Sequence, residues 1–337
     1  MIKTTRRKIL VGLAAAPILS VPARGETMGS ITRLDPALDA LIDPASPVEV
    51  IARGYRWSEG PVWVRDGGYL LFSDVPANVV YRWTRFDGAR PFLSPSGLAG
   101  PIPAGIREAG ANGLTVASDG ALIVADSGSR AIARVDLATK HKTILADRFE
   151  GKRFNSCNDV AIGRGGAIYF TDPSYGLADG DESSLKELDF NGVFRLQPDG
   201  KVELIDRSLS RPNGIALSPA GDKLYIGCSD EKRPEIRVYD LAVDGSPTGP
   251  GRQLVDFSAE FARKLPGLPD GLEVARTGHL FASGPGGLYI IAPDGTKLGM
   301  IALDKAVANC AFGEDGKTLF LTASDMLARV RLKVPGW

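Results

Sequence analysis

The most constraining feature of this sequence is a short pattern that occurs six times: an oxygen-bearing side chain followed at once by a short apolar strand. The six copies are EGPVWV from Glu59, NGLTVAS from Asn112, NDVAIGR from Asn158, NGIALSP from Asn213, DGLEVAR from Asp270 and NCAFGED from Asn309. We call the first residue of each copy a lead residue. The copies are spaced by about 50 residues, near the length of one blade of a β-propeller.

Each copy is followed by the same succession of strands. A second apolar strand comes after a turn (YLLFSD, ALIVAD, AIYFTD, KLYIGC, HLFASG, TLFLTA), then a third strand and, in most copies, a fourth. The sixth copy reaches Trp337 before a fourth strand, and PVEVIARGYRW, just before Glu59, can supply it. The sequence therefore predicts an all-β, six-bladed β-propeller over residues 47–337, with N- and C-terminal strands closing the ring and removing exposed edges.

Other folds explain the pattern less well. A pair of β-sandwiches does not account for six equal units, and no period of 3.6 residues indicates an α/β protein. Three longer connections, 94–111, 173–191 and 258–269, interrupt the repeat next to predicted strands. Because long loops in compact domains are often functional, we expect them to form a rim over one face of the ring.

The N-terminus has the features of an export signal. Arg6 and Arg7 precede an apolar run over residues 9–23 that is too short to span a bilayer. We therefore expect a cleaved signal peptide over 1–25, of the twin-arginine type, followed by an N-terminal extension over 26–46. This predicts a periplasmic protein that meets the twin-arginine export machinery during secretion and has no membrane association after cleavage.

Composition excludes several functions. Lys and Arg number 40, as do Asp and Glu, so the formal net charge is zero and a nucleic-acid partner is not expected. The three cysteines, Cys157, Cys228 and Cys310, have no CxxC spacing, and His141 and His279 are the two histidines. A zinc site built on cysteine or histidine is therefore not expected. Both histidines fall in predicted turns, so no Ser-His-Asp arrangement can be assembled around them.

The lead residues are the candidate site. In a propeller the first strand of each blade lines the central axis, so the six lead residues project toward one mouth of the channel. Taken singly, each Asn-Gly or Asp-Gly is typical of a turn; the recurrence at equivalent positions favours a site. Two carboxylates with amide oxygens suit Ca²⁺, although Mg²⁺ or Mn²⁺ also accept oxygen ligands. A cation in an open site polarises a carbonyl, and a carboxylate can act as base.

At these residues the sequence resembles the SMP-30/gluconolactonase/luciferin-regenerating-enzyme family of calcium-dependent propellers, and within it the periplasmic bacterial gluconolactonases. The matching runs span nearly the whole mature chain: WSEGPVWV, FSDVPAN, ADSGSRAI, GKRFNSCNDV, YFTDPSYGL, NGVFRL, LSRPNGIALSP, GLPDGL, LFASGPGGLYI and NCAFGEDGKTLF.

The resemblance implies roles for individual residues. Glu59, Asn213 and Asp270 match the metal-ligand positions, Asn158 matches a position that binds metal or substrate, and Asp270 also matches the general base. Arg153 and Asn112 are implied substrate contacts. Asn155 and Asn158 both fit the asparagine of the RFNSCND run, and alignment to the NDV strand favours Asn158; Cys157 stands where relatives commonly have proline.

We therefore expect a calcium-dependent sugar lactonase, a carboxylic-ester hydrolase. By resemblance its substrate is D-glucono-1,5-lactone, although xylono-, galactono- and arabinonolactone are close in shape, and the product is the aldonic acid. Two alternatives stay open. One is another metal-dependent ester or organophosphate hydrolase on the same scaffold, with more apolar rim loops. The other is a non-catalytic propeller that binds a protein or glycan and holds a purely structural ion.

Overall fold

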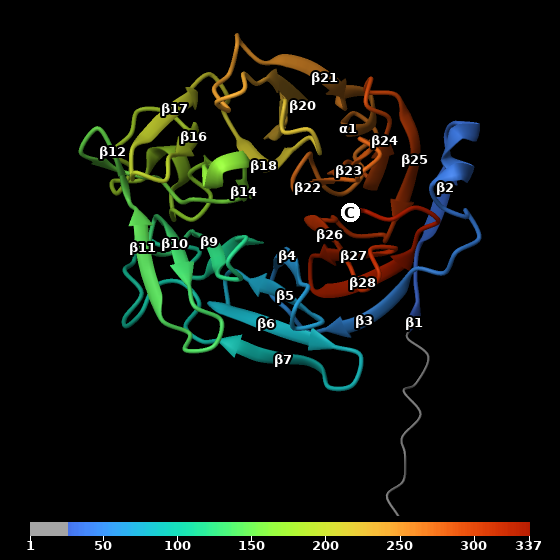
Figure 1. The fold of residues 1–337 in the computed structure, drawn as a ribbon, viewed down its shortest axis with the longest axis horizontal. Helices are drawn as coiled ribbons and strands as arrows, with labels where there is room; N and C mark the ends of the chain where they lie inside the picture. Colours follow the sequence, from blue (N-terminus) through green and yellow to red (C-terminus); the bar gives the residue numbers. More distant parts are fainter. Residues whose placement is uncertain (1–25) are drawn as a thin grey trace, which may run out of the picture.

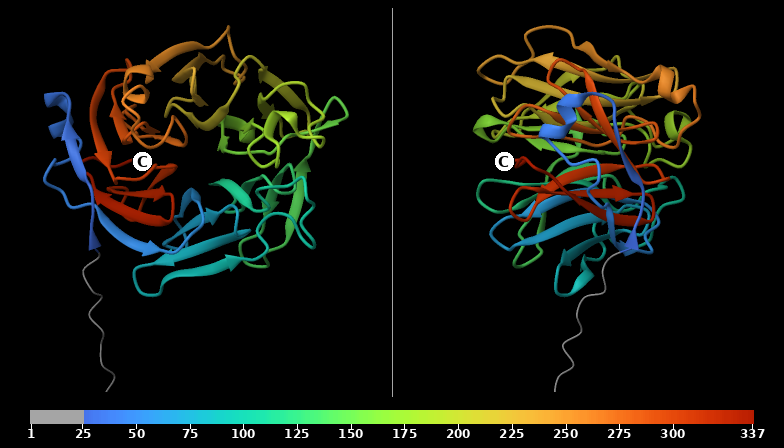
Figure 2. Two further views of the ribbon diagram at one scale, coloured as in Figure 1. Left: turned by 180° about the vertical axis from the view of Figure 1, so that it is seen from behind. Right: turned by 90° about the vertical axis from the view of Figure 1, so that its right-hand side faces the viewer.

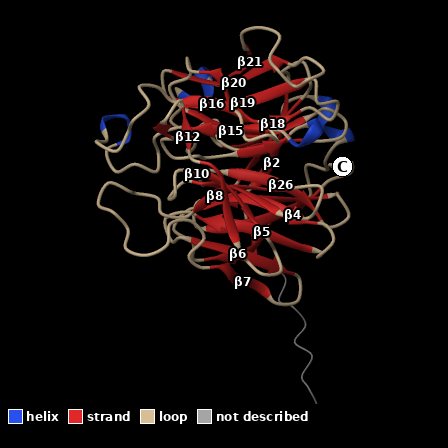
Figure 3. Ribbon diagram, turned by 60° about the vertical axis from the view of Figure 1, so that its left-hand side comes forward, coloured by secondary structure: helices blue, strands red, loops and turns tan. Residues whose placement is uncertain are grey.

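A computed structural model describes residues 26–337, so the predicted export signal lies outside the described residues. The chain forms six small antiparallel sheets arranged as blades around a central axis (Figure 1). Strands make up the body of the molecule, and the few helical segments are short (Figure 3). The predicted six-bladed, all-β propeller is confirmed.

The first three blades each contain four strands. Blade one is β4 (Ser58–Val64), β5 (Tyr69–Asp74), β6 (Val79–Thr84) and β7 (Gly88–Leu93). Blade two is β8 (Ala111–Val116), β9 (Leu122–Asp126), β10 (Ala131–Val135) and β11 (Lys142–Ala146). Blade three is β14 (Val160–Ile162), β15 (Ile168–Asp172), β16 (Gly192–Leu196) and β17 (Val202–Asp206).

The last three blades follow the same order. Blade four is β18 (Pro212–Leu217), β19 (Lys223–Asp230), β20 (Arg233–Asp240) and β21 (Arg252–Asp256). Blade five is β22 (Leu272–Val274), β23 (Leu280–Gly284), β24 (Gly287–Ile291) and β25 (Lys297–Ala302). Blade six contains β26 (Asn309–Gly313), β27 (Thr318–Ala323) and β28 (Met326–Arg331), and its fourth strand comes from the N-terminal part of the chain.

That fourth strand is β3 (Glu49–Arg53), which pairs antiparallel with β28, Met326 opposite Arg53 and Ala328 opposite Val50. The prediction that the two ends of the domain close the ring is confirmed.

The N-terminal extension adds further outer strands. β1 (Glu26–Thr27) pairs with β3, and β2 (Ser30–Arg33) pairs with β25 on the outside of blade five, with Ile31 opposite Ile301 (Figure 2). A short 3-10 helix, η1 (Pro36–Ala40), follows.

The core lies between blades. The buried apolar side chains of residues 26–337 form six clusters, and each joins two neighbouring blades. Between blades two and three, for example, Phe154, Phe170 and Phe194 pack with ring centroids 5.1–5.4 Å apart. Each sheet is therefore covered on both faces, which explains why the second strands read as continuous apolar runs rather than alternating ones.

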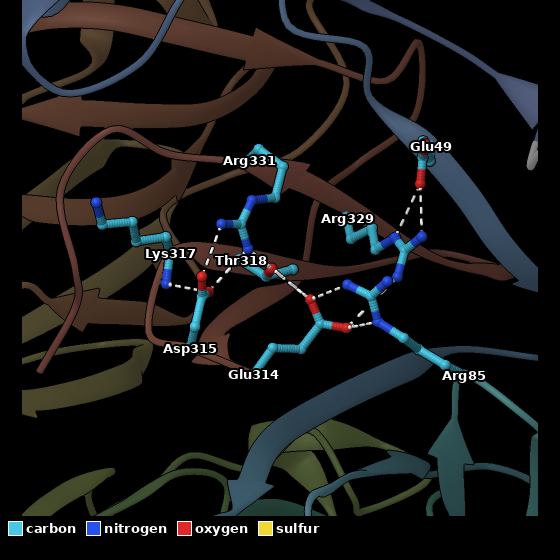
Figure 4. Close-up of polar contacts among 8 residues, drawn as sticks. All are labelled: Glu49, Arg85, Glu314, Asp315, Lys317, Thr318, Arg329 and Arg331. Carbon is cyan, nitrogen blue, oxygen red and sulfur yellow. Dashed lines mark hydrogen bonds and ion pairs between the residues drawn. The ribbon is translucent and has the colours of Figure 1, made fainter.

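An ion-pair network crosses the seam where the ring closes (Figure 4). Glu314, in the turn between β26 and β27, accepts hydrogen bonds from the Arg85 Nε at 2.6 Å and from the Thr318 hydroxyl at 2.5 Å. Arg329 of β28 donates to Glu49 of β3 at 2.8 Å. Because Arg85 belongs to the β6–β7 turn, the network joins blade one to blade six and to the closing strand.

The remaining elements lie in connections. They are the hairpin of β12 (Arg148–Phe149) and β13 (Lys152–Arg153), the 3-10 helices η2 (Arg164–Gly166) and η3 (Gly180–Glu182), and α1 (Ser258–Phe261). No helical segment within residues 26–337 has the length and apolar character needed to cross a bilayer.

Candidate functional site

The lead residues stand at or just before the inner strands, β4, β8, β14, β18, β22 and β26, which surround the axis (Figure 1). Four lead residues are followed by glycine, and the glycine is required there by close packing rather than by a turn. A Cβ on Gly60 would lie 2.0 Å from the Asn112 carbonyl oxygen, and one on Gly214 would lie 2.2 Å from that of Asp270. Neighbouring inner strands thus approach so closely that only glycine fits, which draws the lead side chains together.

Glu59 is the first carboxylate of the site. It lies in β4 with only 3% of its surface exposed, and its Oε2 accepts hydrogen bonds from the Gly60 amide at 2.8 Å and the Asn309 Nδ2 at 3.3 Å. Burial raises the pKa of Glu59 to about 8, and the nearby charges of Asp159 and Glu108 act in the same direction. These hydrogen bonds do not offset the cost of a buried charge, so the site favours a proton or a cation at this position.

Asp270 is the second carboxylate. It precedes β22, and its backbone amide donates to the Ser283 hydroxyl at 2.8 Å. Burial, followed by the charge of Glu59, raises the pKa of Asp270 well above its ordinary value. Two neighbouring carboxylates whose pKa values are both raised form a pair that a cation would stabilise in its ionised form.

Three amides complete the set. Asn112, Asn158 and Asn213 are each 5–6% exposed. The Nδ2 of Asn213 donates to the Ser229 hydroxyl at 2.9 Å, and that hydroxyl donates to the Pro269 carbonyl at 2.6 Å. This chain fixes the Asn213 amide with its Oδ1 as the remaining acceptor, the atom that a hard cation would bind.

A cavity of about 440 Å³ collects these groups: Glu59, Asn112, Asn158, Asn213 and Asp270 all line it. The three long connections also contribute, through Glu108 from 94–111, Tyr175 from 173–191, and Phe261, Leu265 and Leu268 from 258–269. The structure thus brings the expected rim loops over the mouth that carries five lead residues.

The sixth lead residue lies differently. Asn309 donates to Glu59 and accepts a hydrogen bond from the Cys310 amide at 2.8 Å, and it lines a second, larger space on the other side of the channel. Asn309 therefore holds the Glu59 carboxylate by a hydrogen bond and does not line the cavity of the other five lead residues.

Two other residues weighed from the sequence have different surroundings. Asn155 is fully buried, and its Nδ2 donates to the backbone carbonyls of Asp172 and Phe190 at 3.0 and 2.9 Å. This explains why Asn158, and not Asn155, reaches the cavity. Arg153 donates from Nη2 to the Ser129 carbonyl at 2.7 Å and faces Asp147. In this structure Arg153 is engaged in these contacts, and its substrate role stays a prediction.

Sequence reasoning missed Glu108 and Tyr175. Both stand in the long connections, outside the repeat that identified the lead residues, so no periodic signal marks them. The acidic Glu108 four residues before Asn112 was the one available hint. Burial raises the pKa of Glu108, and Arg107 and the Ser127 hydroxyl partly offset this effect. Glu108 is therefore a third carboxyl group in this cavity whose charged form is disfavoured by desolvation.

The donor set fits an oxygen-binding cation. The cavity lining in residues 26–337 contains no Lys, Arg or His to neutralise Glu59 and Asp270. Within that same range no three His, Cys, Asp or Glu side chains converge into a metal-binding group of their own. An ion here would therefore depend on the amide oxygens of Asn158 and Asn213 beside the two carboxylates, a set typical of Ca²⁺ rather than Zn²⁺.

The histidines lie away from this chemistry. His141 is exposed in the turn between β10 and β11, and the His279 Nδ1 lies 2.9 Å from the Thr277 hydroxyl in the turn between β22 and β23. Burial lowers the pKa of His279.

Comparisons with known proteins agree with this geometry. Residues 57–325 match the family described as the SMP-30/Gluconolactonase/LRE-like region. The chain is 49% identical to a gluconolactonase of Zymomonas mobilis, over 99% of each chain. It is 25% identical to a pentonolactonase of Haloferax volcanii, over 82% of this chain and 84% of the relative.

Among solved structures, a gluconolactonase from Xanthomonas campestris superimposes with a TM-score of 0.78 at 29% identity, covering 93% of this chain and 99% of that one. The family match covers blades one to five, part of blade six and all six lead residues. This chain belongs to the SMP-30/gluconolactonase/LRE-like family.

Proposed function

We propose that this protein is a divalent-cation-dependent sugar lactonase that hydrolyses D-glucono-1,5-lactone, or a related aldonolactone, to the aldonic acid. One observation carries the proposal: two carboxylates, Glu59 buried and Asp270 partly buried, and three buried amides, from five different blades, line one open cavity whose lining within residues 26–337 has no basic side chain. The relatives named as gluconolactonases and as a pentonolactonase support a lactone as the substrate class.

Calcium is the ion we expect, held by Glu59, Asn158, Asn213 and Asp270. When bound, such an ion supplies Lewis-acid polarisation of a carbonyl oxygen. The protein's own residues orient the reactants. Asn112, Glu108 and Tyr175 face the space where a substrate would lie, and the fixed Asn213 amide keeps the cavity floor in place.

Asp270 is the proposed base. It lines the cavity together with the other proposed ligands of the ion, and a carboxylate at that place can take a proton from water. Water adds to the lactone carbonyl carbon, the ring carbon–oxygen bond breaks, and the proton passes to the departing ring oxygen. The product is an open-chain hydroxy acid, and Asp270 is then ready for another water.

The test is pH-stat hydrolysis of D-glucono-1,5-lactone, corrected for spontaneous opening, with calcium and after chelation. Activity should require the ion and fall by about 100-fold or more in Asp270→Asn. Asp66→Asn, an exposed carboxylate in the β4–β5 turn, is the matched control and should retain full activity. A rate equal to the blank while calcium binds would show that sugar lactones are the wrong substrates.

A second candidate is hydrolysis of another ester or of an organophosphate. The apolar side chains of Phe261, Leu265 and Leu268 favour it, because they give one wall of the cavity a hydrophobic surface. The same assay with aryl esters and with a phosphofluoridate separates the two. A non-catalytic binding module predicts an inaccessible ion, whereas the candidate ligands line an open cavity, which supports catalysis.

We also propose that the protein is exported to the periplasm, since Arg6 and Arg7 precede the apolar run over 9–23. Replacing both arginines with lysine should leave the precursor in the cytoplasmic fraction, whereas the unchanged precursor should yield a shortened periplasmic form.

A further inference from the structure

The two long connections that carry Glu108 and Tyr175 are joined to one another. Ile106 and Leu177 form an antiparallel bridge. The amides of Arg107 and Glu108 both donate to the Gly176 carbonyl, at 2.8 and 3.2 Å, and the Ala178 amide donates to the Gly105 carbonyl at 3.0 Å. Backbone hydrogen bonds thus join the two connections into a single rim on the blade-two and blade-three side of the cavity.

The backbone beside Glu108 is also held by hydrogen bonds to Leu98 and Val75. The Ala109 carbonyl accepts a hydrogen bond from the Leu98 amide at 2.8 Å, and the Gly110 amide donates to the Val75 carbonyl at 3.0 Å. A Cβ on Gly128 would lie 2.0 Å from the Ala109 carbonyl oxygen, so the chain is held against its neighbour as closely as a glycine allows. A side chain on such a rigid segment loses little entropy when it binds a ligand.

The Glu108 carboxylate keeps acceptor capacity toward the cavity. Its side chain is 19% exposed, and its ion-pair contact, to Arg107 Nη2, is long at 3.7 Å, with the arginine itself 53% exposed. Such an exposed and distant pair contributes little. Tyr175, from the other half of the rim, presents a phenol to the same space.

The wall formed by residues 258–269 has the opposite character. Phe261, Leu265 and Leu268 line the cavity there and offer no hydrogen bonds from their side chains. The cavity is therefore amphipathic, with a carboxylate and a phenol on the rim and an apolar surface from another connection. A sugar ring has a matching division between its hydroxyl groups and its C–H surfaces.

We propose that Glu108 is a specificity-determining residue that accepts hydrogen bonds from the ring hydroxyls of the lactone, with Tyr175 beside it. The wall formed by Phe261, Leu265 and Leu268 contacts the C–H surface of the ring. This inference rests on the proposed lactonase function and adds to it: the rim selects polyhydroxylated lactones over lactones without hydroxyls.

The experiment compares D-glucono-1,5-lactone with δ-valerolactone, which has the same ring size and no hydroxyls. For Glu108→Gln, kcat/KM on gluconolactone should fall by about 10-fold, mainly through KM, because a charge-assisted hydrogen bond is replaced by a neutral one. The value on δ-valerolactone should change by less than about 2-fold. Calcium affinity, measured by titration calorimetry, should be unchanged.

Glu182→Gln is the matched control: an exposed carboxylate of η3 in the other connection of the rim, outside the cavity lining. It should change neither substrate's kinetics. Tyr175→Phe gives an independent variant should Glu108→Gln fold poorly, and it should show the same selective loss on gluconolactone.

Other results would overturn the inference. An equal loss on both lactones in Glu108→Gln would make the residue part of the reaction itself, and a loss of calcium affinity would make it a ligand. If the ratio of kcat/KM on gluconolactone to kcat/KM on δ-valerolactone is unchanged in both variants, other residues recognise the ring hydroxyls. A wild-type protein inactive on both lactones with calcium bound would overturn the proposed function as well, which separates the two failures.

Discussion

At the scale of single residues, the site depends on how the protein accommodates two carboxylates in one cavity. Burial raises the pKa of both Glu59 and Asp270, the charge of Glu59 raises that of Asp270 further, and the cavity lining within residues 26–337 offers them no basic partner. Each hydrogen bond to Glu59 comes from a neutral group, so the remaining charge has to be met by a proton or by a bound cation. If calcium is the ion, as proposed, we expect protons to compete with it.

The competition predicts how calcium affinity depends on pH. Without the ion, Glu59 holds a proton up to about pH 8, and Asp270 also has a raised pKa. Binding displaces these protons, so the apparent affinity should rise by about tenfold per pH unit for each proton released, and the contribution of Glu59 should level off above about pH 8. Titration calorimetry between about pH 6 and pH 9, in buffers of different ionisation enthalpy, measures both affinity and proton release.

The stability of the ion-free protein should change with pH in the opposite direction to the calcium affinity: it should fall as pH rises. A carboxyl whose pKa rises from 4.5 to about 8 on folding stabilises the fold below the lower value and loses that contribution as pH rises to the upper one. Chelated protein should thus become less stable from about pH 5 to pH 8. Glu59→Gln should reduce the proton release; release that is absent in the wild type would mean that Glu59 is already ionised.

The sequence predicted much of this site because the fold repeats it. Five lead residues line the cavity, since equivalent positions in equivalent blades converge on the axis. Asn309 departs from the others: its side-chain amide donates to Glu59 and accepts from the Cys310 backbone amide, and it lines the space on the other side of the channel. Glu108 and Tyr175 could not be found this way, because their positions are set by contacts between two non-repeating connections.

At the scale of elements, the N-terminal extension is the part that repeat reasoning left without structure. It contains β1, β2 and η1, and its short strands have no apolar alternation to identify them. Leu38 of η1 is 0% exposed and packs into the core cluster between blades five and six. Asp35 caps η1 by accepting the Ala37 amide at 2.8 Å, which fixes the approach of Leu38 to that core.

Leu38→Ala should therefore destabilise the protein by about 2–5 kcal/mol, through lost burial and a residual cavity. Leu34→Ala, whose side chain belongs to a residue that is 53% exposed, should change stability by less than about 0.5 kcal/mol. Urea denaturation followed by tryptophan fluorescence measures both. Equal values for the two variants would show that the extension does not dock on blades five and six in solution.

The seam network gives a second prediction for elements. Glu314 has a side chain only 11% exposed, and although burial favours its protonated form, Arg85, Thr318 and Arg329 hold its pKa below the ordinary value. Glu314→Gln leaves these donors without their charged acceptor and should cost about 1–3 kcal/mol near neutral pH. Asp189→Asn, which breaks the exposed pair with Arg207, should cost less than about 1 kcal/mol.

The pH dependence of stability shows whether the effect of Glu314→Gln comes from the lost charge. A carboxylate with a lowered pKa stabilises the fold above its ordinary pKa and loses that contribution as pH falls through the lowered value. Wild type and Glu314→Gln should thus converge in stability in acid. A difference that persists there would mean that the substitution acts through packing and not through charge.

At the scale of the whole molecule, the ring is held at its rim by β3 and at its axis by the lead residues. Six apolar clusters between blades supply the body of the stability, and each contacts only two blades. The six-fold repeat predicted the six blades and the closure of the ring from sequence. It could not predict that β2 adds a fifth strand to blade five, because that pairing depends on the path of a segment outside the repeat.

A cation at the axis would act on the molecule as a whole, because its proposed ligands come from four blades: Glu59 from the first, Asn158 from the third, Asn213 from the fourth and Asp270 from the fifth. An ion that binds only the closed ring stabilises it by about 2.7 kcal/mol at a concentration of 100 times the dissociation constant. Calcium should therefore raise the melting temperature by roughly 5 °C or more. Far-ultraviolet circular dichroism should stay unchanged, since each blade keeps its own hydrogen bonds.

Scanning calorimetry with calcium, with magnesium and after chelation measures this shift, and Glu59→Gln supplies the contrast. The variant removes one carboxylate that the ion would bind. Because Glu59 holds a proton up to about pH 8 without the ion, near neutral pH the substitution exchanges a neutral carboxyl for a neutral amide in the ion-free ring. The variant should therefore melt near the temperature of chelated wild type and gain little from calcium. A calcium shift of equal size in both proteins would place the stabilising ion away from Glu59 and leave the axis without its proposed role.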